Sequence, residues 1–176
     1  MITPVWVRID DRLIHGQVVT AWVGQVRPTK ILIVDAMMAA DSFMKPFLES
    51  LKPGGVPVAV VDVEQALRYL EGADDQGRCF VLVREPTPLR VLQQAGVRLQ
   101  QVNVGGMGMR TGRVLVWRNI ASSPEEWQSL QDLQEHGAEV FLQPTPADPK
   151  VKLHDVKFPS KPPKPPTTGN KEGRGR

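Results

Sequence analysis

The stretch Cys79-Phe80-Val81-Leu82-Val83 contains only apolar residues, without the polar side chains at alternate positions that mark a half-exposed strand. Such a run indicates a strand that is covered on both faces. Five further short runs, several of them also apolar on both faces, predict strands at residues 5–9, 31–34, 58–61, 102–104 and 140–142. Strands buried on both faces are typical of a parallel sheet that lies between two layers of helices.

Segments with helical periodicity separate these runs, and several have recognisable ends. The residues Ser123-Pro124-Glu125-Glu126 have the arrangement of a capping box, and Gly137 is a suitable stop for the helix that follows. Thr87-Pro88 predicts another helix start, with Thr87 as the N-cap, and Gly96 predicts its end. The chain therefore alternates between strands and helices.

Two segments are harder to assign. Pro46 interrupts the helical pattern of residues 41–51, so this helix either starts near Lys45 or is kinked. Residues 105–120 begin with glycines and contain one possible short strand at 114–117. Asp62, in contrast, is a clear candidate cap for a short helix that ends near Gly72.

These patterns predict one α/β domain over residues 1–156, with an open, mostly parallel sheet and helices on both faces. A disulfide framework is excluded because Cys79 has no partner, and its apolar neighbours predict a buried, reduced thiol in a cytosolic protein. The sequence has no apolar run long enough for a transmembrane helix, and charged residues from Arg8 to Arg12 interrupt any signal peptide.

The basic character of the chain comes from its last twenty residues. Residues 157–176 carry six basic groups and one acidic group, Glu172, whereas residues 1–156 carry a small acidic excess. The same twenty residues hold five prolines and few apolar side chains, which predicts a disordered basic Pro/Lys-rich tail. The folded part has no basic excess, so we expect no nucleic-acid binding. The tail has at most a weak electrostatic contact with an anionic membrane or partner.

The densest polar cluster is the run Arg8-Ile9-Asp10-Asp11-Arg12-Leu13-Ile14-His15-Gly16-Gln17-Val18. It follows the first predicted strand and leads into a helix expected over residues 17–23. A neutral imidazole is a competent nucleophile near pH 7, a helix start offers free backbone N–H groups, and arginines neutralise phosphoryl oxygens. An aspartate can orient the imidazole. The cluster therefore suits a phosphate-handling site built around His15.

Two other interpretations of this cluster stay open from the residues alone. The charged residues could form surface ion pairs, with His15 as a polar residue beside a helix start. A metal site is the weaker alternative, because His15, His136 and His154 are scattered along the chain and none lies at metal-ligand spacing.

A glycine-rich loop and an aspartate end two other predicted strands. The loop 104–112 contains Gly105, Gly106 and Gly108, but it lacks the third glycine and the following helix of a dinucleotide site. It is either a tight turn or a support for a pocket beside His15, since both loops lie at the same edge of the sheet. Asp35 either faces the same crevice or caps the next element.

The sequence from Arg8 to Val18, with Trp22 after it, closely resembles the active-site segment of enzyme IIB components of the mannose/fructose/sorbose family of the bacterial sugar phosphotransferase system. The stretch Val102-Asn103-Val104-Gly105-Gly106-Met107 is similar to a second signature of that family. Asp35, the following Ala39-Ala40-Asp41 and the final Asp148-Pro149-Lys150 also match in position and order. The resemblance covers residues 3–156. The tail has no counterpart in it, and nothing is carried over to residues 109–113.

The resemblance implies that His15 is phosphorylated, at Nδ1. It would accept phosphate from the phosphohistidine of a IIA component and pass it to a sugar delivered by membrane IIC and IID components. Arg12 would neutralise the phosphoryl oxygens, with Arg8 and Asp10 as local organisers. The expected phosphate- or substrate-binding residues are Gly16, Gln17, Asp35, Gly105 and Gly106. No nucleotide, metal or other cofactor is expected, because the phosphoramidate donor is already activated.

The resemblance leaves the use of the site open. We expect a cytoplasmic phosphotransferase that associates peripherally with a membrane permease, with the IIA component on a separate chain. The alternative is a regulatory binding module whose phosphorylation state reports sugar availability. The sequence names neither the sugar nor the oligomeric state.

Overall fold

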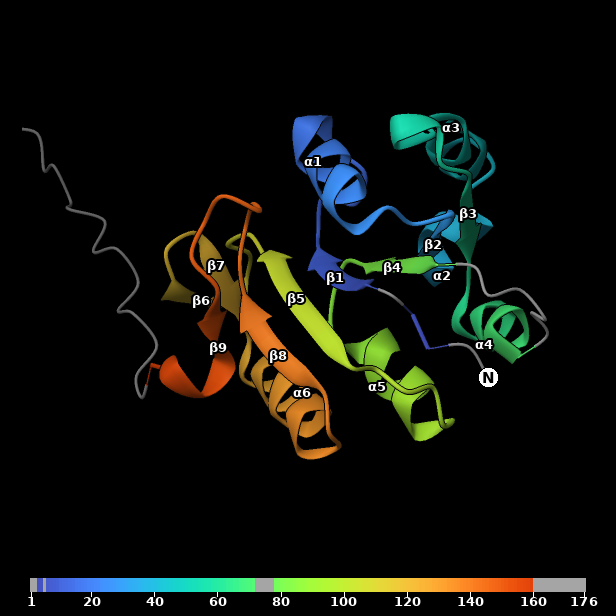
Figure 1. Ribbon diagram of the computed structural model, residues 1–176. Coiled ribbons are helices and arrows are strands. Elements are labelled where there is room, and N and C mark those ends of the chain that lie inside the picture. Colours follow the sequence, from blue (N-terminus) through green and yellow to red (C-terminus); the bar gives the residue numbers. More distant parts are fainter. Residues whose placement is uncertain (1–2, 5, 72–77, 160–176) are drawn as a thin grey trace, which may run out of the picture.

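A computed structural model describes residues 3–4, 6–71 and 78–159 of the chain. Its main feature is a sheet of seven strands in the order β3-β2-β4-β1-β5-β8-β9 (Figure 1). All neighbours in this sheet run parallel except β8 and β9, which are antiparallel. The strands are β1 (Trp6–Asp10), β2 (Lys30–Val34), β3 (Val58–Val61), β4 (Cys79–Val83), β5 (Gln101–Gly106), β8 (Glu139–Leu142) and β9 (Val151–Lys152). The prediction of a mostly parallel α/β sheet is confirmed.

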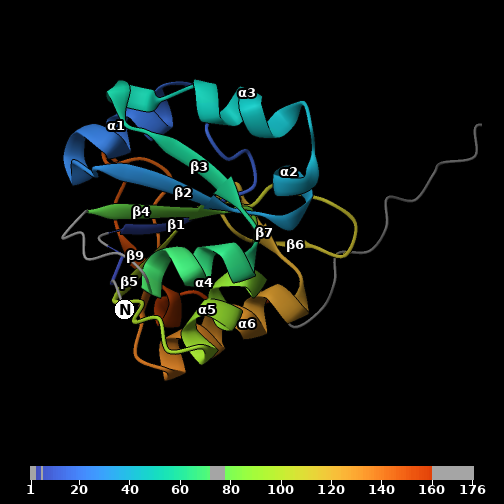
Figure 2. The ribbon, with the colours of Figure 1, turned by 90° about the vertical axis from the view of Figure 1, so that its right-hand side faces the viewer.

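Helices cover both faces of the sheet (Figure 2). One face carries α1 (Gly16–Val26) and α3 (Met44–Ser50), and the opposite face carries α4 (Val63–Glu71), α5 (Thr87–Gln94) and α6 (Pro124–Glu135). The short helix α2 (Ala36–Ala40) and two single turns, at Pro53–Gly55 and Leu153–Asp155, complete the helical elements. Because every central strand is sandwiched between these layers, its side chains are buried on both sides.

The two faces of the sheet form separate hydrophobic cores. The core under α1 and α3 is built around Trp22, Phe80 and Leu82, and the core under α4, α5 and α6 around Val81, Val83 and Leu130. Successive residues of β4 thus point into opposite cores, as the run at 79–83 predicted. Cys79 is a free, buried thiol, and burial raises its pKa to about 11, so it stays a thiol rather than a reactive thiolate.

Most predicted helix ends are confirmed. Ser123 accepts a hydrogen bond from the Glu126 N–H and forms a full capping box at α6, and Asp62 caps α4 through the Gln65 N–H. The helix interrupted by Pro46 begins at Met44, one residue before the predicted start. The assignment of Thr87 as an N-cap was wrong: Thr87 is the first residue of α5, Pro86 is its N-cap, and no side chain caps that end.

The Ser123 cap gives a prediction for stability. Replacing Ser123 with Ala removes the side-chain acceptor for the Glu126 N–H at the start of α6, so we expect the free energy of unfolding to fall by about 1 kcal/mol. A urea titration followed by far-UV circular dichroism measures this change. An equally stable Ser123→Ala protein would show that the cap contributes nothing.

Two parts of the chain differ from the sequence-based expectation. Residues 107–122 leave the main sheet and form an antiparallel hairpin of β6 (Val114–Trp117) and β7 (Ile120–Ser122). Strand β9 was not predicted, because its two residues have no alternating pattern of their own. The folded part also continues past residue 156, since the Phe158 ring lies 5.5 Å from that of Trp127. The rest of the predicted tail, residues 160–176, lies outside the described residues.

The connections that leave β1 and β5 fix the position of the site. After β1 the chain passes through α1 on one face toward β2, and after β5 it continues through the hairpin and α6 on the other face toward β8. Because β1 and β5 are neighbours and their connections diverge, a crevice opens between their C-terminal ends. Each helix within residues 3–4, 6–71 and 78–159 is too short or too polar to span a lipid bilayer.

Candidate functional site

The loop after β1 places His15 at the start of α1. The chain makes a turn in which the Leu13 N–H donates to the Asp10 carbonyl oxygen at 2.9 Å. Leu13 has a positive φ of 53°, and its buried side chain holds this strained backbone in place. Gly16, with φ of 45°, begins α1 and is open to solvent. His15 is the N-cap residue, but its side chain accepts no hydrogen bond from the helix. The first N–H groups of α1 are therefore left without a side-chain cap.

Asp10 is the centre of the charged cluster. Its fully buried carboxylate accepts from Arg8 Nη2 at 2.8 Å and from Arg12 Nε at 3.1 Å. The Arg12 backbone N–H also donates to it, at 3.2 Å. Nε2 of His15 lies 3.9 Å from the same carboxylate. One carboxylate therefore organises two guanidinium groups and the imidazole.

Arg8 is fully buried beneath this carboxylate. Its guanidinium donates to Asp10, to the Asn103 side chain and to the carbonyl oxygens of Gln143 and Pro144. Burial lowers the pKa of Arg8, and the pair with Asp10 opposes that shift. Arg8 is thus an internal support that cannot meet a ligand directly. Asn103 was given no role in the sequence analysis. The signal that could have indicated one is a polar side chain between Val102 and Val104 in a strand expected to be buried.

Gly105 and Gly106 make room for the two charged side chains. A Cβ atom at Gly105 would lie 1.9 Å from Cζ of Arg8, and one at Gly106 would lie 2.6 Å from Oδ1 of Asp10. Both glycines are buried at the end of β5. They were predicted to bind phosphate at this strand end. The structure places them at that end, but packed against the Arg8–Asp10 pair, which they accommodate.

The His15 ring is partly accessible. Its side chain is 22% exposed, and Nδ1 lies 2.9 Å from the Leu13 carbonyl oxygen. Because a carbonyl oxygen only accepts, Nδ1 carries the ring proton in this arrangement. Nε2 is buried and has no hydrogen-bond partner among the described residues. The ring is therefore partly exposed at the start of α1, with the Leu13 carbonyl oxygen beside Nδ1 and the Asp10 carboxylate near Nε2.

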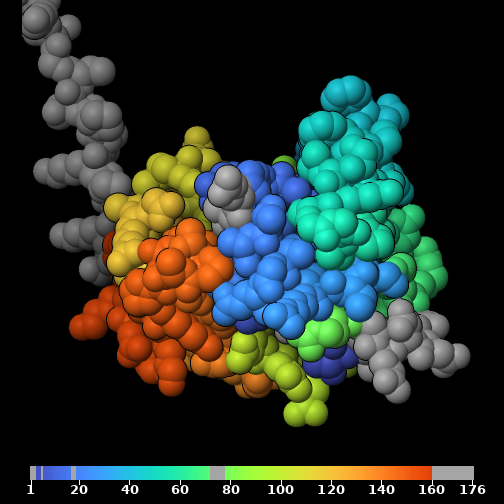
Figure 3. Space-filling model, turned by 45° about the horizontal axis from the view of Figure 1, so that its top comes forward, coloured from blue at the N-terminus to red at the C-terminus, as the bar shows by residue number. Residues whose placement is uncertain are grey.

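Arg12 is the most exposed member of the cluster, with 51% of its side chain accessible. It lines a crevice of about 530 Å³ together with Asp11, Met37, Arg84, Glu85 and Arg110. These residues come from the ends of β1, β2, β4 and β5, so the predicted convergence of loops at one edge of the sheet is found. Figure 3 shows the neighbouring surface, with α1 in the middle, α3 on one side and the segment after β8 on the other.

Asp35 lies at this edge but uses both its oxygens internally. Oδ1 accepts from the Met38 N–H at 2.9 Å, which caps α2, and Oδ2 pairs with Arg84. Of the two sequence-based readings, the cap is therefore confirmed. As a carboxylate that is already paired, Asp35 holds Arg84 in the crevice and offers no donor to a phosphoryl group. Gln17 is the second residue of α1, where its backbone N–H belongs to the first turn.

A second ion-pair network ties the site loop to the hairpin. Arg113 is buried and donates to both oxygens of Glu126, at 2.6 and 2.8 Å, and to Asp11 at 3.1 Å. Burial opposes the charged form of Arg113, but Glu126 and Asp11 outweigh it and raise its pKa. Arg110 also pairs with Glu126. Sequence reasoning missed this network, because its partners are 13 and 102 residues apart from Arg113.

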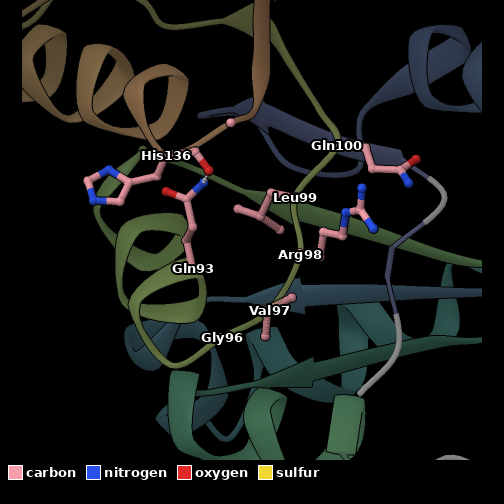
Figure 4. Close-up of a pocket in the computed structure, with 8 residues that line it drawn as sticks. Gln93, Gly96, Val97, Arg98, Leu99, Gln100 and His136 are labelled. Atoms are coloured by element: carbon pink, nitrogen blue, oxygen red, sulfur yellow. Dashed lines mark hydrogen bonds between the residues drawn. The ribbon is translucent and has the colours of Figure 1, made fainter.

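A second hollow lies at the opposite edge of the sheet. About 540 Å³ in volume, it is lined by residues that precede β5 and β8, including Arg98 and His136 (Figure 4). Gln93 at the end of α5 reaches across and donates to the His136 carbonyl oxygen. Since His15 lies at the C-terminal ends of the strands, this hollow takes no part in the site. Within the described residues, no group of three His, Cys, Asp or Glu side chains could hold a metal ion.

Comparison with known proteins agrees with this geometry. A family profile described as "PTS system sorbose subfamily IIB component" matches residues 4–162. The chain belongs to this family of IIB components. The sorbose-specific EIIB component of Klebsiella pneumoniae is 30% identical over 149 residues, which cover 84% of this chain and 91% of that protein.

This IIB chain is also similar to a longer two-part protein and to a solved crystal structure. The mannose-specific EIIAB component of Escherichia coli is 35% identical over 85% of the chain, but only 46% of that longer protein is covered, so the chain spans about half its length. The crystal structure of the sorbose permease IIB domain from Klebsiella pneumoniae superposes with a TM-score of 0.84, at 28% identity, over 88% of this chain and 95% of that one. This IIB chain therefore matches its family in sequence and in fold.

Proposed function

We propose that this IIB chain is a phosphoryl carrier in which His15 accepts phosphate from a IIA component and donates it to a sugar. The observation that carries the proposal is the partly exposed imidazole at the start of α1, which shares the Asp10 carboxylate with Arg12 and the buried Arg8. The family membership supports a transferase role, and the residues supply a nucleophile and charge stabilisation without a bound cofactor.

Transfer to His15 exchanges one P–N bond for another. The lone pair of Nδ1 attacks the phosphorus, the P–N bond of the donor phosphohistidine breaks, and its electron pair returns to the donor ring. Nδ1 must first release the Leu13 carbonyl oxygen, and the ring proton must lie on Nε2. Asp10, 3.9 Å from Nε2, is placed to hold that proton after a small shift of the ring. No net proton transfer accompanies the step.

The charged side chains around His15 balance one another, which suits a phosphoryl group that binds only transiently. Five arginines (Arg8, Arg12, Arg84, Arg110, Arg113) are paired with five carboxylates (Asp10, Asp11, Asp35, Glu85, Glu126). A phosphoryl group adds between one and two negative charges to this balanced set. Arg12 is the exposed cation nearest in sequence to His15, and the first N–H groups of α1, which begins directly after His15, have no side-chain cap. Arg12 and the helix start can thereby stabilise the phosphohistidine, although the site carries no net positive charge before phosphorylation.

The partners follow from the same scheme. The donor is a IIA phosphohistidine on a separate chain or domain, and the acceptor is a sugar held by membrane IIC and IID components. The protein then acts in the cytoplasm, in contact with the permease. A 22% exposed ring at the start of α1 agrees with two macromolecules reaching it in turn.

A reconstituted phosphate relay tests this function. The chain is incubated with phosphoenolpyruvate labelled with ³²P, the general carrier proteins of the system and a mannose-type IIA domain. We expect one label per chain, lost in acid and retained in alkali, as for a phosphoramidate. A chain that stays unlabelled while the IIA domain is labelled would refute the proposed carrier function.

Arg12 is expected to matter for rate and little for stability. Because its side chain is about half exposed, Arg12→Gln should change the free energy of unfolding by less than about 1 kcal/mol. It removes a positive charge from the transferring phosphoryl group, so the rate of phosphate acceptance should fall about 100-fold.

A rapid-quench measurement of labelling, with thermal unfolding alongside, separates these two effects. Arg68→Gln is the matched control, since Arg68 also forms an exposed ion pair, with Glu64 at 2.5 Å, on helix α4, which covers the face of the sheet opposite to α1. Equal rates for Arg12→Gln and the control would remove the role given to Arg12.

A further inference from the structure

The loop of His15 carries a second carboxylate, Asp11, which the transfer scheme does not use. Asp11 and Arg12 are consecutive residues and line the same crevice. A free carboxylate at this position would compete with the phosphoryl group for Arg12 and would repel the phosphoryl oxygens. Like charges at close range inside a protein cost far more than in water, so such a group has to be restrained.

Both restraints on Asp11 come from the hairpin region. Its Oδ2 accepts from the Gly108 N–H at 2.6 Å and from Nη1 of Arg113 at 3.1 Å. Nη1 of Arg113 also donates to the Gly108 carbonyl oxygen at 2.8 Å, so guanidinium and loop backbone hold Asp11 from the same side. The Asp11 carboxylate is thereby turned toward the hairpin.

The position of Arg113 is itself fixed by buried contacts. Its side chain is only 1% exposed, and Glu126 holds it by two parallel hydrogen bonds. Glu126 is in turn fixed by the capping box at the start of α6. A continuous set of contacts therefore runs from α6 through Glu126 and Arg113 to Asp11. A buried, doubly bonded guanidinium is far more rigid than a surface ion pair.

We propose that Arg113 is a positioning residue that holds the carboxylate of Asp11 away from Arg12, so that the Arg12 N–H groups not bonded to Asp10 are available to the phosphoryl group. The proposal rests on the proposed carrier function. Arg113 does not touch the reacting atoms. Its removal leaves Asp11 with the Gly108 N–H alone and also removes the bond that holds the Gly108 carbonyl oxygen, so Asp11 becomes free to turn toward Arg12. Glu126 keeps Arg110 as a partner, so it is not left as an unpaired charge.

The test is a double-mutant cycle on Arg113 and Asp11. Arg113→Gln should accept phosphate about tenfold more slowly than the wild type. In the Asp11→Asn background, the same Arg113→Gln change should slow the reaction no further, since no carboxylate remains to be released. Arg90→Gln, which removes a partly buried ion pair with Asp132 away from the site, is the control for a general loss of stability.

A second measurement is independent of phosphate transfer. The Nε–H signal of Arg12, which donates to Asp10, is followed by ¹H–¹⁵N NMR. It should shift in Arg113→Gln and return toward its position in Asp11→Asn when both changes are combined. If Arg113→Gln does not fold, Arg113→Lys is used, because a lysine cannot bond Glu126 and Asp11 in the same way.

The outcomes separate the two proposals. Loss of rate in Arg113→Gln that is absent in the Asp11→Asn background, with the matching shift of the Arg12 signal, supports the positioning role. An equal loss of rate in both backgrounds, or an unchanged Arg12 signal, overturns it. A wild-type chain that takes no phosphate refutes the carrier function, and the Arg12 signal then still decides whether Arg113 restrains Asp11.

Discussion

Replacing His15 with Ala should abolish phosphate acceptance while leaving the fold intact. The imidazole supplies the attacking lone pair, and no other histidine among the described residues lies at this edge of the sheet. The ring is partly exposed and makes one hydrogen bond, to the Leu13 carbonyl oxygen, so its loss should cost about 1 kcal/mol of stability. Labelling from a phosphorylated IIA domain and thermal unfolding measure the two quantities.

His136 offers a closely matched control. Its Nδ1 also contacts a backbone carbonyl oxygen, that of Asp132 at 2.7 Å, but it lies at the opposite edge of the sheet. His136→Ala should therefore accept phosphate like the wild type, with a similar small change in stability. A His15→Ala protein that is folded and still labelled to the wild-type extent would contradict the role of His15.

Replacing Gly105 with Ala should destabilise the protein more than any other single methyl group added near the site. The new Cβ would lie 1.9 Å from the buried guanidinium carbon of Arg8, which is surrounded by fixed partners. Either the backbone of β5 shifts or Arg8 leaves its partners, and we expect the free energy of unfolding to fall by about 3–5 kcal/mol. Denaturant titration measures this fall.

Gly24 is the matched control for that change. It lies in the exposed part of α1, and a Cβ there would meet nothing within 4 Å. Gly24→Ala should thus raise the free energy of unfolding by about 0.5–1 kcal/mol, because alanine favours the helix. If Gly105→Ala is as stable as the wild type, Gly105 is not needed to accommodate Arg8.

Sequence reasoning was reliable where local pattern determines structure. The apolar run at 79–83 gave a strand with two buried faces, and Ser123 with Glu126 gave a complete capping box, because both signals act within a few residues. The hairpin of β6 and β7 was only half predicted. Its second strand, Ile120–Ser122, has only three residues, too few to show an alternation of apolar and polar side chains. Its pairing with β6 depends on tertiary context.

The candidate site shows the same division. The cluster from Arg8 to His15 could be read as one unit, because its members are adjacent in sequence and the fold brings them to one strand end. Gly105 and Gly106 were assigned to the right place with a different role, since only coordinates show that Arg8 and Asp10 fill the space above them. Arg113 gave no local signal, because its partners lie on other elements.

The most direct test of the account is to locate the phosphoryl group. The chain is phosphorylated by a IIA domain, digested, and sequenced by tandem mass spectrometry at alkaline pH, where phosphohistidine survives. The account predicts a single phosphoryl group on the peptide that contains His15, on that residue. A phosphoryl group on His136, His154 or any carboxylate, with His15 unmodified, would contradict it.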